Sequence, residues 1–243
     1  MRIFAPMWME LTDLLMPRQC LVCGRTLGAA ERHLCLWCAA DLPLTYNWER
    51  THHPMADAFN AALEHLRPEG EVLPYAYATS LLLYHQENPY KAIPQAIKYH
   101  DNQEAGRFFG SLLGYQMASQ PHFADIDLVI PVPLHWLRRY RRGYNQAQVI
   151  AAAVAAELQA TLAPRALRRV RRTRTQTRLN AEDRLRNVQG VFRARKAIQA
   201  RHVLLVDDTF TTGATLAACY MAIKKATGPG TRISVATLAV VED

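Results

Sequence analysis

Apolar and polar positions alternate along most of the chain in a pattern typical of strands separated by helices. Short apolar or alternating runs that indicate strands lie at residues 75–84, 126–131, 166–170, 203–206 and 233–241. Helical spacing is found at residues 90–119, 144–160 and 213–226. The first strand would also fit a hairpin, and the first helix is expected to break near Pro94 and Asp101. Strands that alternate with helices predict an α/β fold with a mainly parallel sheet flanked by helices.

The N-terminal part of the chain departs from this pattern. Residues 3–15 place Phe4, Met7, Trp8, Leu11, Leu14 and Leu15 on one helical face. That face would pack on the chain's own domain, or it would lie on a membrane surface or a partner helix. Residues 46–72 hold histidines, prolines and short charged stretches, which indicate a connector. We therefore expect an N-terminal helix with a cysteine module at 1–45, a connector at 46–72 and an α/β domain at 73–243.

Four of the five cysteines form two Cys-x-x-Cys pairs. Cys20 and Cys23 make the first pair, and Cys35 and Cys38 make the second after eleven intervening residues. Two such pairs supply the four thiolates of a tetrahedral site that Zn²⁺ accepts. Disulfide bonds are the alternative, but they need an oxidising compartment. We expect a structural zinc ribbon, because four thiolates leave no open coordination position for water.

Composition narrows the class of protein. The chain has 243 residues, of which 50% are hydrophobic and 21% charged, as in ordinary globular proteins. No uninterrupted apolar run is long enough to cross a membrane, so no integral membrane segment is expected. Glu10 and Asp13 interrupt the N-terminal apolar run, which argues against a signal peptide and favours a cytoplasmic location. The fifth cysteine, Cys219, lies in a helical segment and is expected to be a small buried residue.

Positive charge is concentrated in one quarter of the chain. The net charge is +8, but residues 138–201 contain sixteen arginines and one lysine against three acidic residues, a net +14. The remainder of the chain therefore carries −6. Arginine forms planar, bidentate contacts with phosphate, so this quarter favours a phosphate-rich partner. A solvated basic surface is the alternative interpretation.

A candidate ligand site follows the apolar run at 203–206. That run leads directly into Asp207 and Asp208, and a hydroxyl-rich loop and a helix come next. The loop and the first helical turn contain Thr211, Thr212, Gly213, Ala214 and Thr215. Open α/β sheets bind ligands at the carboxyl ends of strands, and a helix N-terminus attracts phosphate. Paired carboxylates accept hydrogen bonds from a vicinal diol, so the stretch predicts a sugar phosphate site, with a self-capped helix as the alternative.

Residues 203–216 resemble the phosphoribosyl pyrophosphate (PRPP) motif of type I phosphoribosyltransferases. The chain also resembles the ComF family of competence-related, phosphoribosyltransferase-like proteins. Two further runs carry this resemblance, Pro131-Val132-Pro133-Leu134 and Arg142-Gly143-Tyr144-Asn145-Gln146. That family also carries an N-terminal four-cysteine ribbon. The resemblance covers about residues 18–40 and 75–241, and it implies a type I phosphoribosyltransferase fold for the α/β domain.

The resemblance implies roles at the matched positions. Asp207 and Asp208 would hold the ribose hydroxyls, and residues 211–215 would wrap the 5-phosphate. Candidates for contact with the pyrophosphate and other phosphate groups are Lys98, Pro131, Pro133 and Arg142. Mg²⁺ would bind with PRPP and stabilise charge on the leaving group. Residues 171–189 resemble the loop that closes over PRPP and excludes water.

The function expected from the resemblance is that of a PRPP-binding, phosphoribosyltransferase-like protein that supports natural transformation. It would act in the uptake or processing of incoming single-stranded DNA, with a competence helicase or another DNA-processing protein as partner. No acceptor site or general base is recognisable, so catalysis is left open. The alternatives are a nucleotide-salvage phosphoribosyltransferase that acts on a free base and a non-catalytic competence factor that binds single-stranded DNA. The candidates for DNA contacts are Arg138, Arg139, Arg141 and Arg142.

Overall fold

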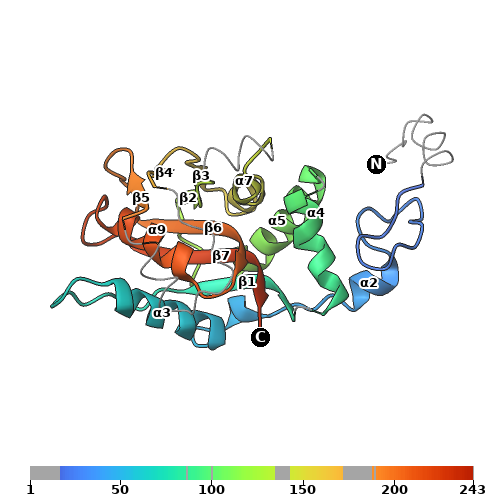
Figure 1. Cartoon of the computed structure of the whole chain (residues 1–243), viewed down its shortest axis with the longest axis horizontal. Coiled ribbons are helices and arrows are strands. Elements are labelled where there is room, and N and C mark those ends of the chain that lie inside the picture. The colour runs from blue at the N-terminus through green and yellow to red at the C-terminus, as the bar shows by residue number, and fades with distance from the viewer. Residues whose placement is uncertain are drawn as a thin grey trace.

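The computed structural model describes residues 17–85, 87–99, 101–134, 143–171, 188 and 190–242 (Figure 1). The expected helix at 3–15 and most of the expected closing loop at 171–189 lie outside these residues. The helices, in chain order, are α2 (Leu36–Ala40), η1 (Asn47–Glu49), α3 (Pro54–Leu66), η2 (Pro89–Lys91), α4 (Ala92–Tyr99), α5 (Gln103–Ala118), α7 (Gln146–Glu157) and α9 (Ala214–Lys224). None of the helices described combines the length and hydrophobicity that a membrane span requires.

The centre of the molecule is a five-stranded sheet in which every neighbouring pair of strands is parallel. Its strands are β1 (Ala78–Tyr84), β2 (Leu128–Pro131), β3 (Thr161–Leu162), β6 (His202–Phe210) and β7 (Arg232–Val241). Their spatial order is β1-β7-β6-β2-β3. A separate antiparallel pair joins β4 (Leu167–Arg169) to β5 (Phe192–Ala194). The predicted α/β class with a mainly parallel sheet is confirmed.

Helices cover both faces of the sheet. α3 and α9 share one core with β4 and β5, whereas α4, α5 and α7 share the other with the cysteine module. α5 and α7 approach closely because Gly110 and Gly114 face α7. A Cβ at these positions would lie 2.9 Å from the Cβ of Ala153 and 2.8 Å from that of Glu157, respectively. Strands buried on both faces explain the continuous apolar runs of β6 and β7.

Three sequence-based boundaries need correction. The segment at 75–84 begins its strand only at Ala78 and pairs in parallel with β7, so it forms no hairpin. Pro94 does not break the helix, because it lies in the first turn of α4, where a missing N–H costs no hydrogen bond. The break at Asp101 is confirmed, and this residue has a left-handed φ of 50°. The third correction concerns β6, which continues beyond residue 206 to Phe210 and so carries both carboxylates on the strand itself.

The expected connector at 46–72 contains helix α3. His53 caps this helix by accepting a hydrogen bond from the Ala56 N–H, and Pro54 occupies its first position. Phe59 and Leu63 are buried, one helical turn apart, and the Phe59 ring lies 6.1 Å from the ring of Tyr220 on α9. Because the segment is rich in polar residues, its sequence pattern did not indicate this apolar helix face. The division into domains itself stays a prediction.

Candidate functional site

The four cysteines of the N-terminal module come together in space. The sulfur atoms of Cys20, Cys23, Cys35 and Cys38 all lie within 4.8 Å of one another. The Sγ atoms of Cys23 and Cys35 are 3.7 Å apart, and a tetrahedral site with Zn–S bonds of about 2.3 Å separates its sulfurs by about 3.8 Å. This cluster can therefore hold a metal ion, as the spacing predicts.

The local backbone favours the thiolate form of Cys20, whereas burial and the neighbouring cysteines raise the pKa of Cys38. Burial raises the pKa of the Cys20 thiol, but hydrogen bonds from the backbone N–H groups of Cys23, Cys35 and Val22 outweigh it and lower the pKa to about 6. Gly24 turns the chain after the first pair with a φ of 72°. A metal ligand must be a thiolate, and N–H donors stabilise the thiolate form. The turn therefore favours the thiolate form of Cys20 even without a metal ion.

The cysteine module packs against the α/β part of the chain. The Tyr90 hydroxyl donates a hydrogen bond of 3.0 Å to the Cys38 carbonyl, and the His33 ring lies 5.2 Å from the Phe108 ring of α5. Figure 1 shows the module at one end of the molecule, beside α4 and α5. Cys20 and Cys35 are buried in the same core as Phe109. The cysteine cluster and the α5 face of the sheet therefore share one core.

The second site lies at the carboxyl end of β6. The Asp208 backbone N–H donates a hydrogen bond of 2.8 Å to Oδ1 of Asp207. The Lys98 ammonium lies 3.2 Å from Oδ1 of Asp208 and donates a hydrogen bond of 2.8 Å to the Thr209 hydroxyl. Burial, and then the charge of Asp208, raise the pKa of Asp207 to about 7. Asp207 therefore ionises near neutral pH, and Lys98 is the cationic partner of Asp208.

Lys98 reaches this strand from the last turn of α4. The Tyr144 hydroxyl donates a hydrogen bond to the carbonyl of Ile97, the residue before Lys98. Ile97 itself is fully buried. These contacts hold the end of α4 against the segment that leads into α7. The sequence-based choice of Lys98 as a phosphate candidate therefore falls on a side chain that faces the carboxylates.

The loop after β6 and the start of α9 enclose a small hollow. Its volume is about 50 Å³, room for several water-sized atoms. Its lining residues are Asp207, Thr209, Phe210, Thr211, Thr212, Gly213, Ala214, Thr215 and Leu216. The N-cap of α9 is Gly213, and no side chain caps this helix. The alternative interpretation, in which a side chain of this stretch caps its own helix, therefore does not hold. Within the described structure the hydroxyls of Thr211, Thr212 and Thr215 make no hydrogen bond to the protein.

Gly213 is fixed by conformation and by close packing. Its φ of 69° is left-handed, and a Cβ there would lie 2.9 Å from the buried Phe210 ring. The loop thus packs directly on the Phe210 ring where it turns at Gly213. Only glycine combines this backbone conformation with so close an approach. The turn places the start of α9 beside the end of β6, where both line the same hollow.

The end of β2 lies beside this site. Pro131 pairs with Val206, one residue before Asp207, and the Val132 N–H donates a hydrogen bond of 2.8 Å to the Val206 carbonyl. The side-chain amide of Asn145 donates a hydrogen bond of 3.0 Å to the Val132 carbonyl. Pro131 and Pro133 therefore lie on the segment that leaves the same sheet edge. The remaining candidates, Arg138, Arg139, Arg141 and Arg142, lie outside the described residues.

Sequence reasoning missed three residues around the carboxylates. Thr209 accepts the Lys98 hydrogen bond, and Tyr84 lies close enough for Lys98, Asp208 and Thr209 to influence its pKa, which burial raises. Arg169 of β4 is the third, and its positive charge helps to lower the pKa of Asp207 against the effect of burial. Thr209 lies within the motif and could have been found from the alternation along the strand. Tyr84 and Arg169 reach the site only through the tertiary fold.

Comparison with known proteins relates the chain to proteins of DNA use. Competence protein F of Haemophilus influenzae is 32% identical over 142 residues, which are 56% of this chain and 62% of that protein. DNA utilization protein YhgH of Escherichia coli O157:H7 is 40% identical over 91 residues, 37% of this chain and 40% of that protein. The same protein of Escherichia coli K12 is 38% identical over 91 residues. The matched regions span less than two thirds of the length of these relatives.

No family model matches the chain. The printed names of these relatives nevertheless agree with the family that the cysteine pairs and the runs around Pro131 and Asp207 resemble. By these similarities the chain resembles the ComF family of competence-related proteins.

Proposed function

We propose that the chain binds a sugar phosphate of the PRPP class at the carboxyl end of β6 and acts in the handling of DNA strands. One observation carries the ligand part. The fold brings the paired carboxylates of Asp207 and Asp208, the Lys98 ammonium and the uncapped N-terminus of α9 to one edge of the sheet. This is the edge where open parallel sheets bind their ligands.

Each part of such a ligand has a matching group. Asp207 and Asp208 would accept hydrogen bonds from the two ribose hydroxyls. The threonine hydroxyls and the first N–H groups of α9 would surround the 5-phosphate, which the positive end of the helix dipole favours. Lys98 would move from Asp208 toward the pyrophosphate, the more highly charged anion. Carboxylate oxygens also suit Mg²⁺, which would neutralise charge on the pyrophosphate when bound.

The DNA part of the proposal is supported by the relatives. Their names refer to competence and to DNA utilization. This favours strand uptake or processing, with a helicase or another DNA-processing protein as partner, over nucleotide salvage from a free base. For the cysteine cluster we propose one structural Zn²⁺, because all four positions around the metal would be thiolates. The expected location is the cytoplasm.

Calorimetric titration of the full chain with PRPP, with and without Mg²⁺, tests the ligand part. The test variant combines Asp207→Asn with Asp208→Asn, and we expect it to fold but to lose measurable PRPP binding. A matched control combines Glu69→Gln with Glu87→Gln, which removes two exposed carboxylates from the turn after α3 and from the segment after β1. Unchanged PRPP affinity in the test variant would contradict the proposal.

A second titration, with single-stranded oligonucleotide, separates the two parts of the proposal. We expect the Asp207→Asn and Asp208→Asn variant to keep its affinity for the oligonucleotide. Binding of the oligonucleotide without any binding of PRPP to the wild-type chain would favour the alternative of a non-catalytic DNA-binding competence factor.

A further inference from the structure

The antiparallel pair of β4 and β5, which we call the hairpin although residues 170–191 separate its strands, places two arginines opposite each other on its outer face. Arg168 pairs directly with Arg193 in the antiparallel register, and both side chains are exposed. The neighbouring pairs face the other way, because Leu167 and Phe192 are buried. Like charges in a directly opposed cross-strand pair destabilise a sheet. A hairpin with strands of only three residues therefore bears this repulsion without an evident structural benefit.

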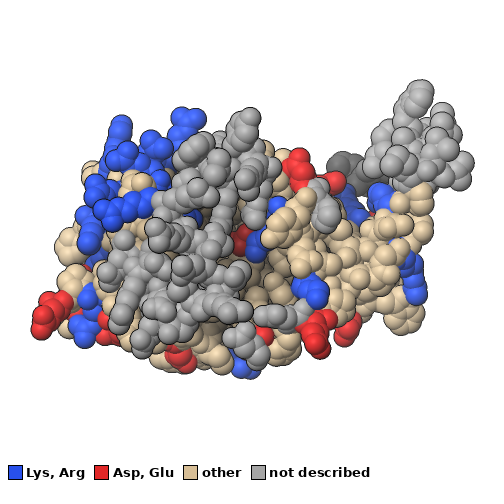
Figure 2. Space-filling view, viewed as in Figure 1, with Lys and Arg blue, Asp and Glu red and all other residues tan. Residues whose placement is uncertain are grey.

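The two arginines belong to a larger group of exposed cations. We call these the hairpin cations: Arg165, Arg168, Arg171, Arg193, Arg195 and Lys196. None of them has a carboxylate within 4.0 Å in the part of the chain that the structure describes. Figure 2 shows blue side chains gathered at the end of the molecule where Figure 1 places β4 and β5. Among the residues that the structure describes, no carboxylate therefore compensates the positive charge of this surface.

A shallow hollow extends the surface beyond the hairpin. Its volume is about 580 Å³, and Arg195, Lys196 and Lys225 are among its lining residues, which include no acidic side chain. Lys225 has a structural reason to be there, since it follows the last turn of α9, where a cation complements the helix dipole. The opposed pair of Arg168 and Arg193 has no comparable reason. Repulsion of this kind is relieved when a chain of negative charges lies between the cations.

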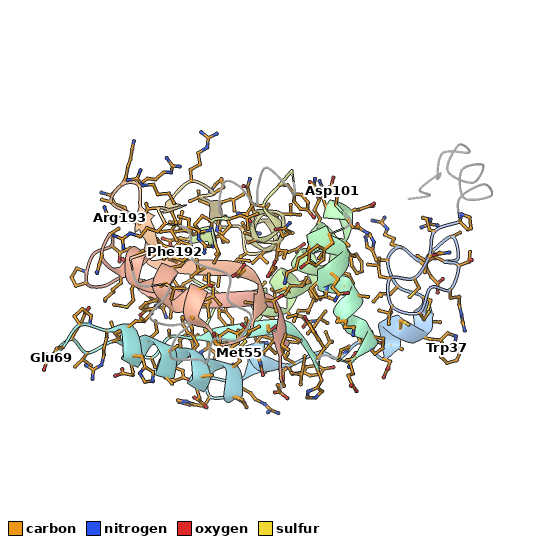
Figure 3. The ribbon with its side chains drawn as sticks, in the orientation of Figure 1. Trp37, Met55, Glu69, Asp101, Phe192 and Arg193 are labelled. Atoms are coloured by element: carbon orange, nitrogen blue, oxygen red, sulfur yellow. The ribbon has the colours of Figure 1, made fainter. Side chains whose placement is uncertain are left out.

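The other face of the same pair of strands carries Arg169, whose positive charge lowers the pKa of Asp207 against the effect of burial. The Arg169 guanidinium lies 5.4 Å from the centre of the Phe192 ring. Figure 3 shows Phe192 and Arg193 as neighbours at this end of the molecule. The hairpin thus has two faces with different partners. One bears Arg169, whose charge acts on Asp207, and the other presents Arg168 and Arg193 to solvent.

We propose that the hairpin cations bind the phosphate backbone of a nucleic-acid strand without regard to its sequence. Guanidinium groups match phosphate oxygens in a bidentate geometry, and opposed arginines can hold successive phosphates. The inference rests on the DNA-handling part of the proposed function and is independent of the PRPP part. The hairpin cations that would contact the nucleic acid lie outside the run of Arg138, Arg139, Arg141 and Arg142.

The single change Arg193→Glu separates binding from folding. It replaces the repulsive pair by an ion pair with Arg168, so the melting temperature should stay the same or rise. Two phosphate contacts are lost together, and affinity for an oligothymidylate should fall at least about tenfold in low salt. The slope of log K against log salt should flatten by about 1.4, at about 0.7 per contact for single strands. Arg50→Glu is the control, an exposed arginine outside the hairpin, and should leave the slope unchanged.

A second variant, Arg168→Gln with Arg193→Gln, removes both charges without introducing an acidic group. It should flatten the slope equally, and a duplex of the same length should show whether double strands share the surface. Salt slopes that stay unchanged in both variants would overturn the inference. So would a slope that responds only to replacement of Arg138, Arg139, Arg141 and Arg142. PRPP titration of the same variants should be unaffected, so failure of this surface is distinguishable from failure of the ligand site.

Discussion

The Lys98 ammonium lies 3.2 Å from the Asp208 carboxylate, although the two residues are on α4 and β6, far apart in the chain. Both side chains are largely buried, with 21% and 18% of their surface exposed. An ion pair in such surroundings interacts more strongly than one in water. Lys98 therefore acts as the local counter-ion of the carboxylates. An arriving polyphosphate would compete for the same ammonium.

Replacing this lysine should weaken PRPP binding more than it weakens the fold. For Lys98→Ala we expect at least a tenfold loss of PRPP affinity, because a charge-assisted contact to phosphate is worth about 1.5–3 kcal/mol. Calorimetry with PRPP and with pyrophosphate measures the loss. Lys225→Ala, which removes an exposed lysine at the end of α9, serves as the control. Equal affinities in the two variants would remove Lys98 from the binding site.

Gly213 should tolerate no side chain. Gly213→Ala adds left-handed strain of about 1–2 kcal/mol and forces a Cβ against the Phe210 ring, so we expect a loss of at least about 2 kcal/mol in unfolding free energy. Gly70→Ala is the matched control, since its φ is 78° but nothing lies within 4 Å of the added Cβ. Urea unfolding of both variants isolates the cost of the contact with Phe210. A cost no greater at Gly213 than at Gly70 would mean that the loop moves away from the ring.

Metal removal should destabilise the chain beyond the cysteine module. We expect one Zn²⁺ per chain, and we expect both a strong chelator and Cys35→Ser to lower the melting temperature, since Cys35 is buried with Phe109. Cys219→Ala is the control, because this buried thiol lies on α9 and outside the cluster. Metal analysis and thermal unfolding give both readouts. A chain that is purified reduced but free of metal, or that contains iron, would contradict the zinc assignment.

The sequence predicted those features that depend on local pattern. Continuous apolar runs identified β6 and β7, and the spacing of the cysteine pairs identified the cluster. Helix α3 was missed because its buried side chains, such as Phe59, are separated by polar ones in a segment rich in histidine and proline. The exact end of β6 was missed because Asp207 and Asp208 are unusual strand residues, held there by pairing with β7.

The contacts across the candidate site were less accessible to sequence reasoning. Lys98 was selected by resemblance, but its partners Asp208 and Thr209 follow from the docking of α4 on the sheet. Arg169 belonged to an arginine-rich stretch with no distinguishing neighbour. Its inward orientation depends on the register of β4 with β5, which pairs it with Phe192. Such pairing between distant segments leaves no periodic signal in the sequence.

The raised pKa of Asp207 predicts that the site lowers the stability of the fold above neutral pH. Burial and the neighbouring Asp208 raise this pKa to about 7, whereas an unfolded chain releases the same proton near pH 4. Between these values the folded chain binds more protons than the unfolded chain, so stability falls as the pH rises toward 7 and then levels off. Asp207→Asn cannot ionise. It should therefore be more stable than wild type at pH 8, by on the order of 2 kcal/mol, and nearly equal to it near pH 4.5.

Urea unfolding of wild type and Asp207→Asn at both pH values checks this difference. Asp57→Asn is the control, because the Tyr75 hydroxyl lowers the pKa of Asp57 and this variant should gain no stability at pH 8. Since the ionised carboxylate is the better acceptor for ribose hydroxyls, PRPP affinity of the wild type should rise from pH 6 to pH 8. A stability difference between wild type and Asp207→Asn that is the same at both pH values would show that Asp207 does not change its protonation there. The stability lost through Asp207 would then have to come from its fixed charge beside Asp208.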